Sequence, residues 1–169
     1  MNASSFFPRV AGSSLDGVRF ELPRDFAGAV NIVVVTFNQD RRADIESWMP
    51  WLKALVRAHE DVRIYELPTI SRGYAMMRAF INGGMRRGVV DPAVRASTIT
   101  LYLDKAAFRR ALNLPAEDSI YVLVVDRRGR VYACEQGPFT AQAAEALERR
   151  LTDVTQRFQT TVGSATNAS

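Results

Sequence analysis

Cysteine is nearly absent from this chain of 169 residues, and its scarcity excludes several kinds of chemistry. Cys134 is the only cysteine, so no intramolecular disulfide can form. His59 is the only histidine, which argues against a His-based zinc site and against a Ser-His-Asp triad. His59 falls on the polar end of an expected helix, where a solvated side chain is typical. We therefore expect neither a bound metal nor a cofactor.

Lysine and long apolar runs are also scarce. Only Lys53 and Lys105 among the 22 basic residues are lysines, and the arginines are scattered along the chain as doublets. Although the net charge is +4, no dense basic tract indicates a nucleic-acid partner. The longest apolar run is six residues, too short to cross a bilayer. Residues 1–15 lack the pattern of a secretory signal, so we expect a cytoplasmic protein, unless a targeting segment has been removed.

The sequence does contain the pattern of a single soluble α/β domain. Its length fits one domain, and 47% hydrophobic residues are sufficient for a core. Residues 1–14 are rich in small residues and are expected to form a flexible lead-in. The domain is expected over residues 15–158, with a disordered tail over 159–169.

Hydrophobic periodicity predicts strands that alternate with helices. The predicted strands cover residues 17–23, 30–37, 61–67, 99–103, 119–125 and 130–135. The predicted helices cover residues 43–59, 72–82, 105–112 and 140–158, with a short turn at 91–95. This order predicts a central mixed β-sheet with helices on both faces.

Turn and cap residues mark the ends of these elements. Pro68 is expected to stop the strand before it, and Gly83-Gly84 to break the helix that begins near Arg72. Gly129 suits a hairpin turn that requires positive φ. The predicted N-cap residues are Ser71, Asp104 and Thr140.

Three segments resemble the thioredoxin-like superfamily, especially its peroxiredoxin-like and thiol-oxidoreductase branches. Residues 15–28 resemble the N-terminal hairpin of that superfamily. Residues 33–55, with the step Met49-Pro50-Trp51-Leu52, resemble its core strand and first helix. Residues 122–131 resemble its closing hairpin. The resemblance implies a thioredoxin-like α/β fold over most of residues 15–155.

The chain departs from this superfamily where the redox members carry their chemistry. Those members present a Cys-x-x-Cys motif at the start of the first helix, and alignment on Pro50 places Arg42 and Ile45 at the two cysteine positions. The cis-proline that faces the reactive cysteine corresponds to about Ile120. Because neither Arg nor Ile performs thiolate chemistry, the resemblance favours a non-catalytic binding protein over an enzyme.

Residues 83–138 resemble, more narrowly, the mitochondrial ATP synthase assembly-factor family numbered ten and its bacterial relatives. The resemblance implies a chaperone that binds a subunit of a membrane complex without redox turnover. The residues that carry it are 84–88, 99–103, 121–126, Gly129-Arg130 and 135–138.

Candidate binding residues lie in two regions. The first comprises residues 38–45 together with Trp48 or Trp51, and the second comprises residues 74–87. In the second region, Tyr74, Met76, Met77, Phe80, Ile81 and Met85 alternate with arginines, and either a core-facing helix or an adaptable partner-binding surface fits this pattern. Such basic amphipathic segments also bind anionic membranes. Trp48 and Trp51 are too close to share a helical face, so one is expected in the core and the other exposed. The predicted partner-binding residues are Arg41, Arg42, Trp48, Arg78, Met85, Arg86 and Arg87.

Two other functions remain open. A one-cysteine thiol peroxidase or redox sensor would use Cys134, although a lone cysteine in an alternating strand is typically a core residue and Glu135 would raise its pKa. A small-anion-binding domain would use residues 38–42, where helix N–H groups and arginines attract anions. At the same place, Asp40 is expected to cap the helix instead.

Overall fold

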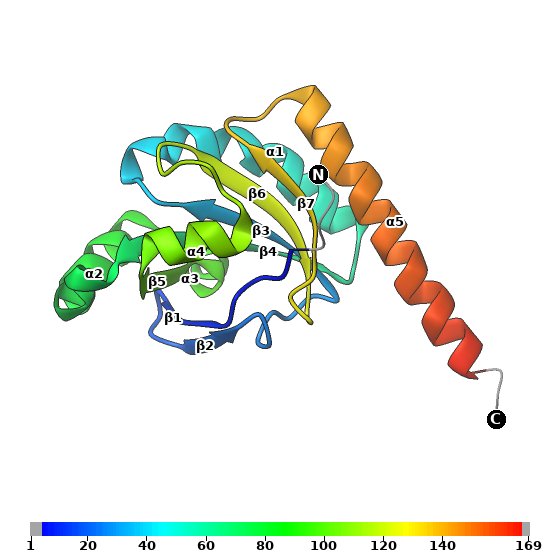
Figure 1. Cartoon of the computed structure of the whole chain (residues 1–169), viewed down its shortest axis with the longest axis horizontal. Helices are drawn as coiled ribbons and strands as arrows, with labels where there is room; N and C mark the ends of the chain where they lie inside the picture. The colour runs from blue at the N-terminus through cyan, green and yellow to red at the C-terminus, as the bar shows by residue number, and fades with distance from the viewer. Residues whose placement is uncertain (1–4, 167–169) are drawn as a thin grey trace.

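The computed structural model describes residues 5–166, with side chains for residues 5–160, and shows one mixed sheet covered by helices on both faces (Figure 1). The strand order is β2-β1-β5-β4-β3-β6-β7. The strands are β1 (Val10–Ser14), β2 (Arg19–Leu22), β3 (Val30–Thr36), β4 (Val62–Ser71), β5 (Ile99–Leu103), β6 (Ile120–Asp126) and β7 (Val131–Gln136). The α-helices are α1 (Arg42–Ala58), α2 (Arg78–Gly88), α3 (Pro92–Ser97), α4 (Lys105–Leu112) and α5 (Ala141–Thr166), and the 3₁₀ helices are η1 (Gln39–Arg41) and η2 (Arg72–Met77).

The centre of the sheet is the antiparallel pair β3 and β6. All seven residues of each strand are buried, as the continuous apolar runs predict. Strand β3 also pairs in parallel with β4, so the predicted mixed sheet is confirmed.

Successive residues of β3 point to opposite faces and divide the core in two. Ile32 and Val34 belong to the cluster beneath α1 and α5, whereas Val33 and Val35 belong to the cluster beneath α4. The three layers are therefore held by one alternating strand at their centre.

The N-terminal segment differs from the expected lead-in. Val10–Ser14 forms β1, which pairs with β2 and β5, and Phe7 is buried in the core beneath α4. At Gly12 an added Cβ would lie 2.7 Å from side-chain atoms of Ile99 and Leu101, so the close approach of β1 to β5 requires glycine there. The small residues that suggested a loose segment permit this approach. Residues 1–4 lie outside the described range.

Two predicted stops do not end their elements. Strand β4 continues through Pro68 to Ser71, because Pro68 is the last residue paired with β3 and the next residue pairs with β5. The missing N–H of Pro68 thus falls where β4 changes its partner. Helix α2 continues through Gly83-Gly84, and Ser71 forms no side-chain cap bond. A glycine pair costs helix stability but does not by itself end a helix.

The C-terminal helix also exceeds its predicted end. Figure 1 shows α5 extending past the sheet, and its last residue is Thr166, where a disordered tail from residue 159 was expected. Among residues 141–160 of α5, whose side chains are described, the last buried one is Val154, and residues 155–160 lie outside the core. Residues 167–169 of the expected tail lie outside the described range.

Several local predictions are confirmed. Asp104 accepts a hydrogen bond from the N–H of Ala107 at 3.0 Å, and Thr140 accepts one from the N–H of Ala143 at 3.1 Å, so both residues act as caps. Gly129 has φ of +85° in the hairpin turn between β6 and β7. The strand 99–103 and the helix 105–112 have their predicted bounds.

The buried side chain of Asn31 joins β3 to its surroundings and offers a test of the fold. Its amide oxygen accepts from the N–H of Gly28 at 2.9 Å, and its amide nitrogen donates to the carbonyls of Gly28 and Val125. Because Asn31→Ala leaves these buried groups unpaired, we expect a loss of about 2–3 kcal/mol in the free energy of unfolding, measured by urea denaturation. The exposed control Gln142→Ala should change it by less than about 0.5 kcal/mol. Equal effects of the two substitutions would contradict this role.

Candidate functional site

The segment between β3 and α1 is the first of the two candidate binding regions, and the resemblance to redox thioredoxin-like proteins places their cysteines here. Strand β3 ends at Thr36, which pairs with Ile120, and η1 leads from there into α1. Asn38 caps η1, since its side-chain oxygen accepts from the N–H of Asp40 at 3.0 Å. The expectation that Asp40 is the cap is therefore wrong, because the capping residue is Asn38, two residues earlier.

An ion-pair cluster lies at the start of α1. The Arg42 guanidinium lies 3.1 Å from a carboxylate oxygen of Glu66 on β4 and 3.1 Å from one of Glu46. Glu66 is buried, and burial raises the pKa of its carboxyl group above 4.5, while Arg42 acts in the opposite direction. The charge of Arg42 is thus committed to neighbouring carboxylates.

Arg41 is arranged differently but also faces an acid. Its guanidinium lies 3.9 Å from a carboxylate oxygen of Asp44, and its buried Nε has no hydrogen-bond partner among the described residues. Together Arg41 and Arg42 face Asp44, Glu46 and Glu66. Because three carboxylates surround two guanidinium groups, the start of α1 lacks the excess positive charge that an anion site here would need.

The two tryptophans form a cluster with Phe139. Trp48 is fully buried, and its Nε1–H donates to the carbonyl of Gly137 at 2.9 Å. The Trp51 ring lies 5.8 Å from that of Trp48 and is partly buried. One tryptophan is in the core, as expected, but Trp48 cannot contact a partner, because it shares the inward stripe of α1 with Ile45.

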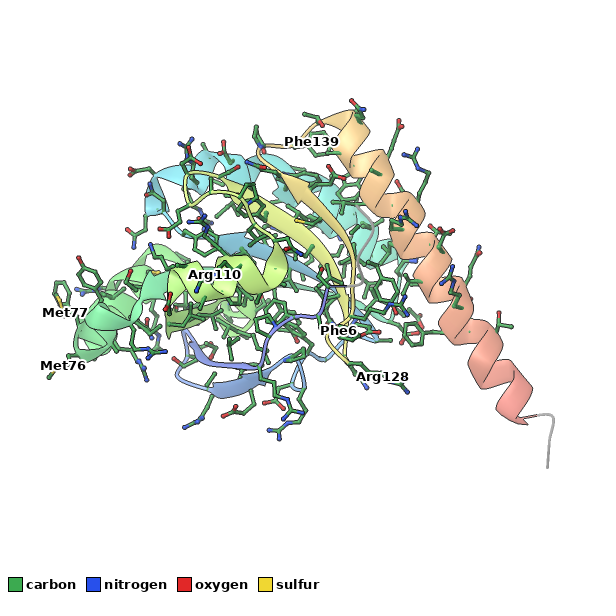
Figure 2. The ribbon with its side chains drawn as sticks, in the orientation of Figure 1. Phe6, Met76, Met77, Arg110, Arg128 and Phe139 are labelled. Atoms are coloured by element: carbon green, nitrogen blue, oxygen red, sulfur yellow. The ribbon has the colours of Figure 1, made fainter. Side chains whose placement is uncertain are left out.

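The second candidate region, Tyr74–Arg87, lies within η2 and α2, whose residues Arg72–Gly88 together are named here the η2–α2 arm. It contains no buried residue, so the interpretation as a core-facing helix is wrong. Met76 is fully exposed and Phe80 is 73% exposed, with Tyr74 and Met77 each exposed by half or more. Figure 2 shows Met76 and Met77 at the end of the molecule opposite the tip of α5.

The arginines of the arm have no acidic neighbour in sequence, since residues 67–90 contain no Asp or Glu. Arg86 reaches Asp16 only at 3.7 Å, and Arg87 donates to the carbonyl of Gly83. Arg78 turns toward the sheet, with its Cζ 5.0 Å from the centroid of the Tyr102 ring. Met85 is partly buried. Of the residues predicted in this segment, Arg78, Arg86 and Arg87 are thus exposed, and Arg78 is the one that lies over an aromatic ring of the sheet.

The sheet brings the two regions to one edge. β3 and β4 are parallel neighbours, and η1 and η2 follow their C-terminal ends. Sequence reasoning missed Glu66, the buried partner of Arg42. A carboxylate between Tyr65 and Leu67 in a predicted strand was an available signal, because a buried charge needs a partner.

Cys134 lies away from this edge. It is in the middle of β7, opposite Leu123, and packs against the core beneath α4, whereas α1 covers the other face. Burial, with a smaller contribution from Glu135, raises its pKa to about 12. A thiol with this pKa is almost wholly protonated at neutral pH, which disfavours a nucleophilic role.

Neither a metal centre nor a membrane span is apparent between residues 5 and 166. In that range no three or more His, Cys, Asp or Glu side chains are grouped so as to hold a metal ion. None of the helices there combines the length and apolar character needed to cross a membrane.

Comparison with known proteins identifies the fold. No protein-family model and no curated protein sequence matches this chain. Among solved structures, it resembles the thioredoxin domain of a thiol-disulfide oxidoreductase from Bacteroides vulgatus (TM-score 0.54, 17% identity, 88% of this chain and 98% of that chain). It also resembles a thiol:disulfide interchange protein of the thioredoxin family from Chlorobium tepidum (TM-score 0.51, 15% identity, 90% and 97%).

A third similar structure is BsSco, described as a member of the Sco family of cytochrome c oxidase assembly proteins (TM-score 0.59, 11% identity, 90% and 95%). These likenesses confirm the predicted thioredoxin-like fold. At such low identity they show the fold alone.

The Arg42–Glu66 pair predicts a pH-dependent stability. A raised pKa makes the folded state retain its proton longer than the unfolded chain, so stability falls as pH rises above 4.5 through the folded pKa. Removing the guanidinium in Arg42→Gln leaves the Glu66 carboxylate unpaired. We expect the free energy of unfolding to fall by about 1–2 kcal/mol at pH 8 and by less at pH 5. This value is kept small because Arg42 is half exposed and solvent screens its charge.

Urea denaturation at several pH values measures this effect. In the double variant with Glu66→Gln, the additional pH dependence should disappear. The matched control Arg57→Gln, on the exposed side of α1, should show no such dependence. Equal losses for Arg42→Gln at pH 5 and pH 8 would refute the coupling.

The position of Cys134 predicts slow alkylation. With a pKa of about 12, about one thiol in ten thousand is ionised at pH 8, so iodoacetamide should label the folded protein far more slowly than the urea-unfolded protein. The labelling rate of the folded protein should rise about tenfold per pH unit between pH 8 and 10. Mass spectrometry measures the adduct, with Cys134→Ser as the blank. Equally rapid labelling of folded and unfolded protein at pH 8 would restore the thiol-enzyme hypothesis.

Proposed function

We propose that this thioredoxin-like protein is non-catalytic and binds an acidic, amphipathic segment of a polypeptide through the η2–α2 arm. The observation that carries the proposal is the outward apolar surface of the arm, formed by Tyr74, Met76, Met77 and Phe80. Contiguous exposed apolar side chains beside polar ones are typical of interaction sites on soluble domains.

The apolar side chains would supply much of the affinity. Complete burial of a Met or Phe side chain contributes about 1.5–3 kcal/mol, so Met76 and Phe80 are the strongest anchors. Unbranched Met side chains also adapt to the shape of a partner, which suits a chaperone that holds a flexible segment.

The charge of the arm favours an acidic partner. Residues 67–90 carry four arginines and no acid, and Arg86 and Arg87 are exposed. Guanidinium groups bind carboxylates in a planar, bidentate geometry, so they would fix the orientation of a segment that the apolar residues hold. The region around Arg42 is an internal ion-pair cluster and contributes less to this surface.

We further propose that the partner is a subunit of a membrane complex and that the protein assists its assembly. The resemblance of residues 83–138 to an ATP synthase assembly-factor family supports this, and the description of the similar BsSco structure names an assembly protein family. Alignment on Pro50 places Arg42 and Ile45 at the positions of the redox cysteines. This supports a role in assembly that depends on binding and not on thiol chemistry.

A designed peptide tests the chemistry of the proposed partner. The probe is a fluorescent helical peptide with Leu and Phe on one face and Glu on the other. A matched control peptide has Lys in place of Glu. Fluorescence anisotropy should show binding of the acidic peptide with a Kd of about 10–100 μM, because a few anchors and ion pairs suffice for that range. The Lys peptide should bind at least about tenfold more weakly.

Variants of the arm locate the binding. Met76→Ser with Phe80→Ser should weaken the acidic peptide at least about tenfold, whereas Phe158→Ser, on the exposed side of α5, should not. Arg86→Gln with Arg87→Gln should also weaken it. The proposal would be refuted if the natural chain bound both peptides equally, or if the arm variants bound the acidic peptide as tightly as the natural chain does. Arm-dependent binding to phosphatidylglycerol vesicles without binding to the acidic peptide would assign the arm to a membrane instead.

A further inference from the structure

Beneath the arm lies a pocket that the proposed polypeptide binding does not use. Its volume is about 580 Å³, within the range typical of small-molecule sites. One wall is the outer part of the sheet, where β1 and β5 pair, and the other is α2. Ala11, which shares a face of β1 with Ser13, has a small side chain and leaves the sheet wall open.

A row of polar side chains crosses the sheet wall of the pocket. Ser13 on β1 pairs directly with Thr100 on β5 and with Arg19 on β2, so the three side chains lie on one face. Thr100 points away from the core beneath α4, because its neighbours Ile99 and Leu101 point into that core.

The hydroxyl of Thr100 has no hydrogen-bond partner in the described part of the chain, although the residue is fully buried. A buried hydroxyl without a partner is costly to the fold and therefore unusual. The hydroxyl of Ser13 likewise has no side-chain partner among the described residues. Two adjacent hydroxyls at the pocket wall are thus available to a ligand.

Helix α2 supplies a cation and an amide to the opposite wall. Arg78 lies over the Tyr102 ring and forms no ion pair with any residue in the described range. The Tyr102 hydroxyl donates to the side-chain oxygen of Asn82 at 3.1 Å, which leaves the Asn82 amide N–H groups free to donate. Arg19 is already paired with Glu21 at 2.9 Å, so Arg78 is the cation that remains for a ligand.

We propose that this pocket binds a small organic anion whose carboxylate or phosphate group pairs with Arg78. The hydroxyls of Ser13 and Thr100 and the amide of Asn82 bond its oxygen atoms. No Asp or Glu lines the pocket, so an anion meets donors without repulsion from its walls. The site lies on the sheet-facing side of α2, whereas the apolar side chains proposed to bind a polypeptide lie on the outward side.

Titration of the full chain with two anions tests the site. Glycerol 3-phosphate and malate each carry a hydroxyl, and they distinguish a phosphate from a carboxylate ligand. At least one of them should shift the amide NMR signals of β1, β5 and α2 at concentrations up to about 10 mM. Binding of only one anion identifies the preferred group and supports the site.

Three variants decide whether the pocket is responsible. Arg78→Gln and Thr100→Val should each weaken binding at least about tenfold. Thr100→Val keeps the side-chain shape, and its thermal midpoint without ligand should equal or exceed that of the natural chain, which shows that it folds. Arg110→Gln, on the exposed side of α4 (Figure 2), is the matched control and should bind normally.

The outcomes separate this site from the polypeptide surface. Met76→Ser with Phe80→Ser should bind the anion as the natural chain does. The site is refuted if neither anion shifts any signal, if Arg110→Gln weakens binding as much as Arg78→Gln, or if the shifts centre on residues 38–46.

Discussion

The complete burial of β3 and β6 is the constraint on which the rest of the molecule depends. Two apolar strands side by side must be covered on both faces, since neither face can be left to water. Helices α1 and α5 cover one face and α4 covers the other. Helix α2 contributes no residue to either core cluster and has no buried residue.

The η2–α2 arm and the first residues of α1 are two segments at the same end of the sheet, and their charged side chains are arranged differently. At α1, the Arg42–Glu66 ion pair joins the first residue of the helix to the buried strand β4. At α2, Arg78 and Asn82 line the pocket on the sheet-facing side, while Phe80 faces outward. The helix therefore covers a pocket to which it contributes these two polar side chains, and it presents an exposed surface that combines Phe80 with Arg86 and Arg87.

Much of the fold could be predicted from local patterns. The continuous apolar runs of β3 and β6 and the caps Asp104 and Thr140 are short-range signals, and the structure confirms them. Two of the errors occurred where a tertiary contact overrode the local sequence pattern. Pro68 is tolerated because β4 changes partner there, and the small residues of β1 are ordered because they allow close pairing with β5.

The sequence by itself determined the alternating α/β order, the presence of a single cysteine and the candidate apolar and basic residues of the arm. Only the tertiary structure decided which of these residues are exposed. Trp48 and Met76 are both large apolar residues on helical segments, yet one is fully buried and the other fully exposed. Helical periodicity defines a face but not what covers it, because burial depends on contacts between segments distant in the chain. The same reason hid Glu66 and Thr100, whose environments exist only once the strands pair.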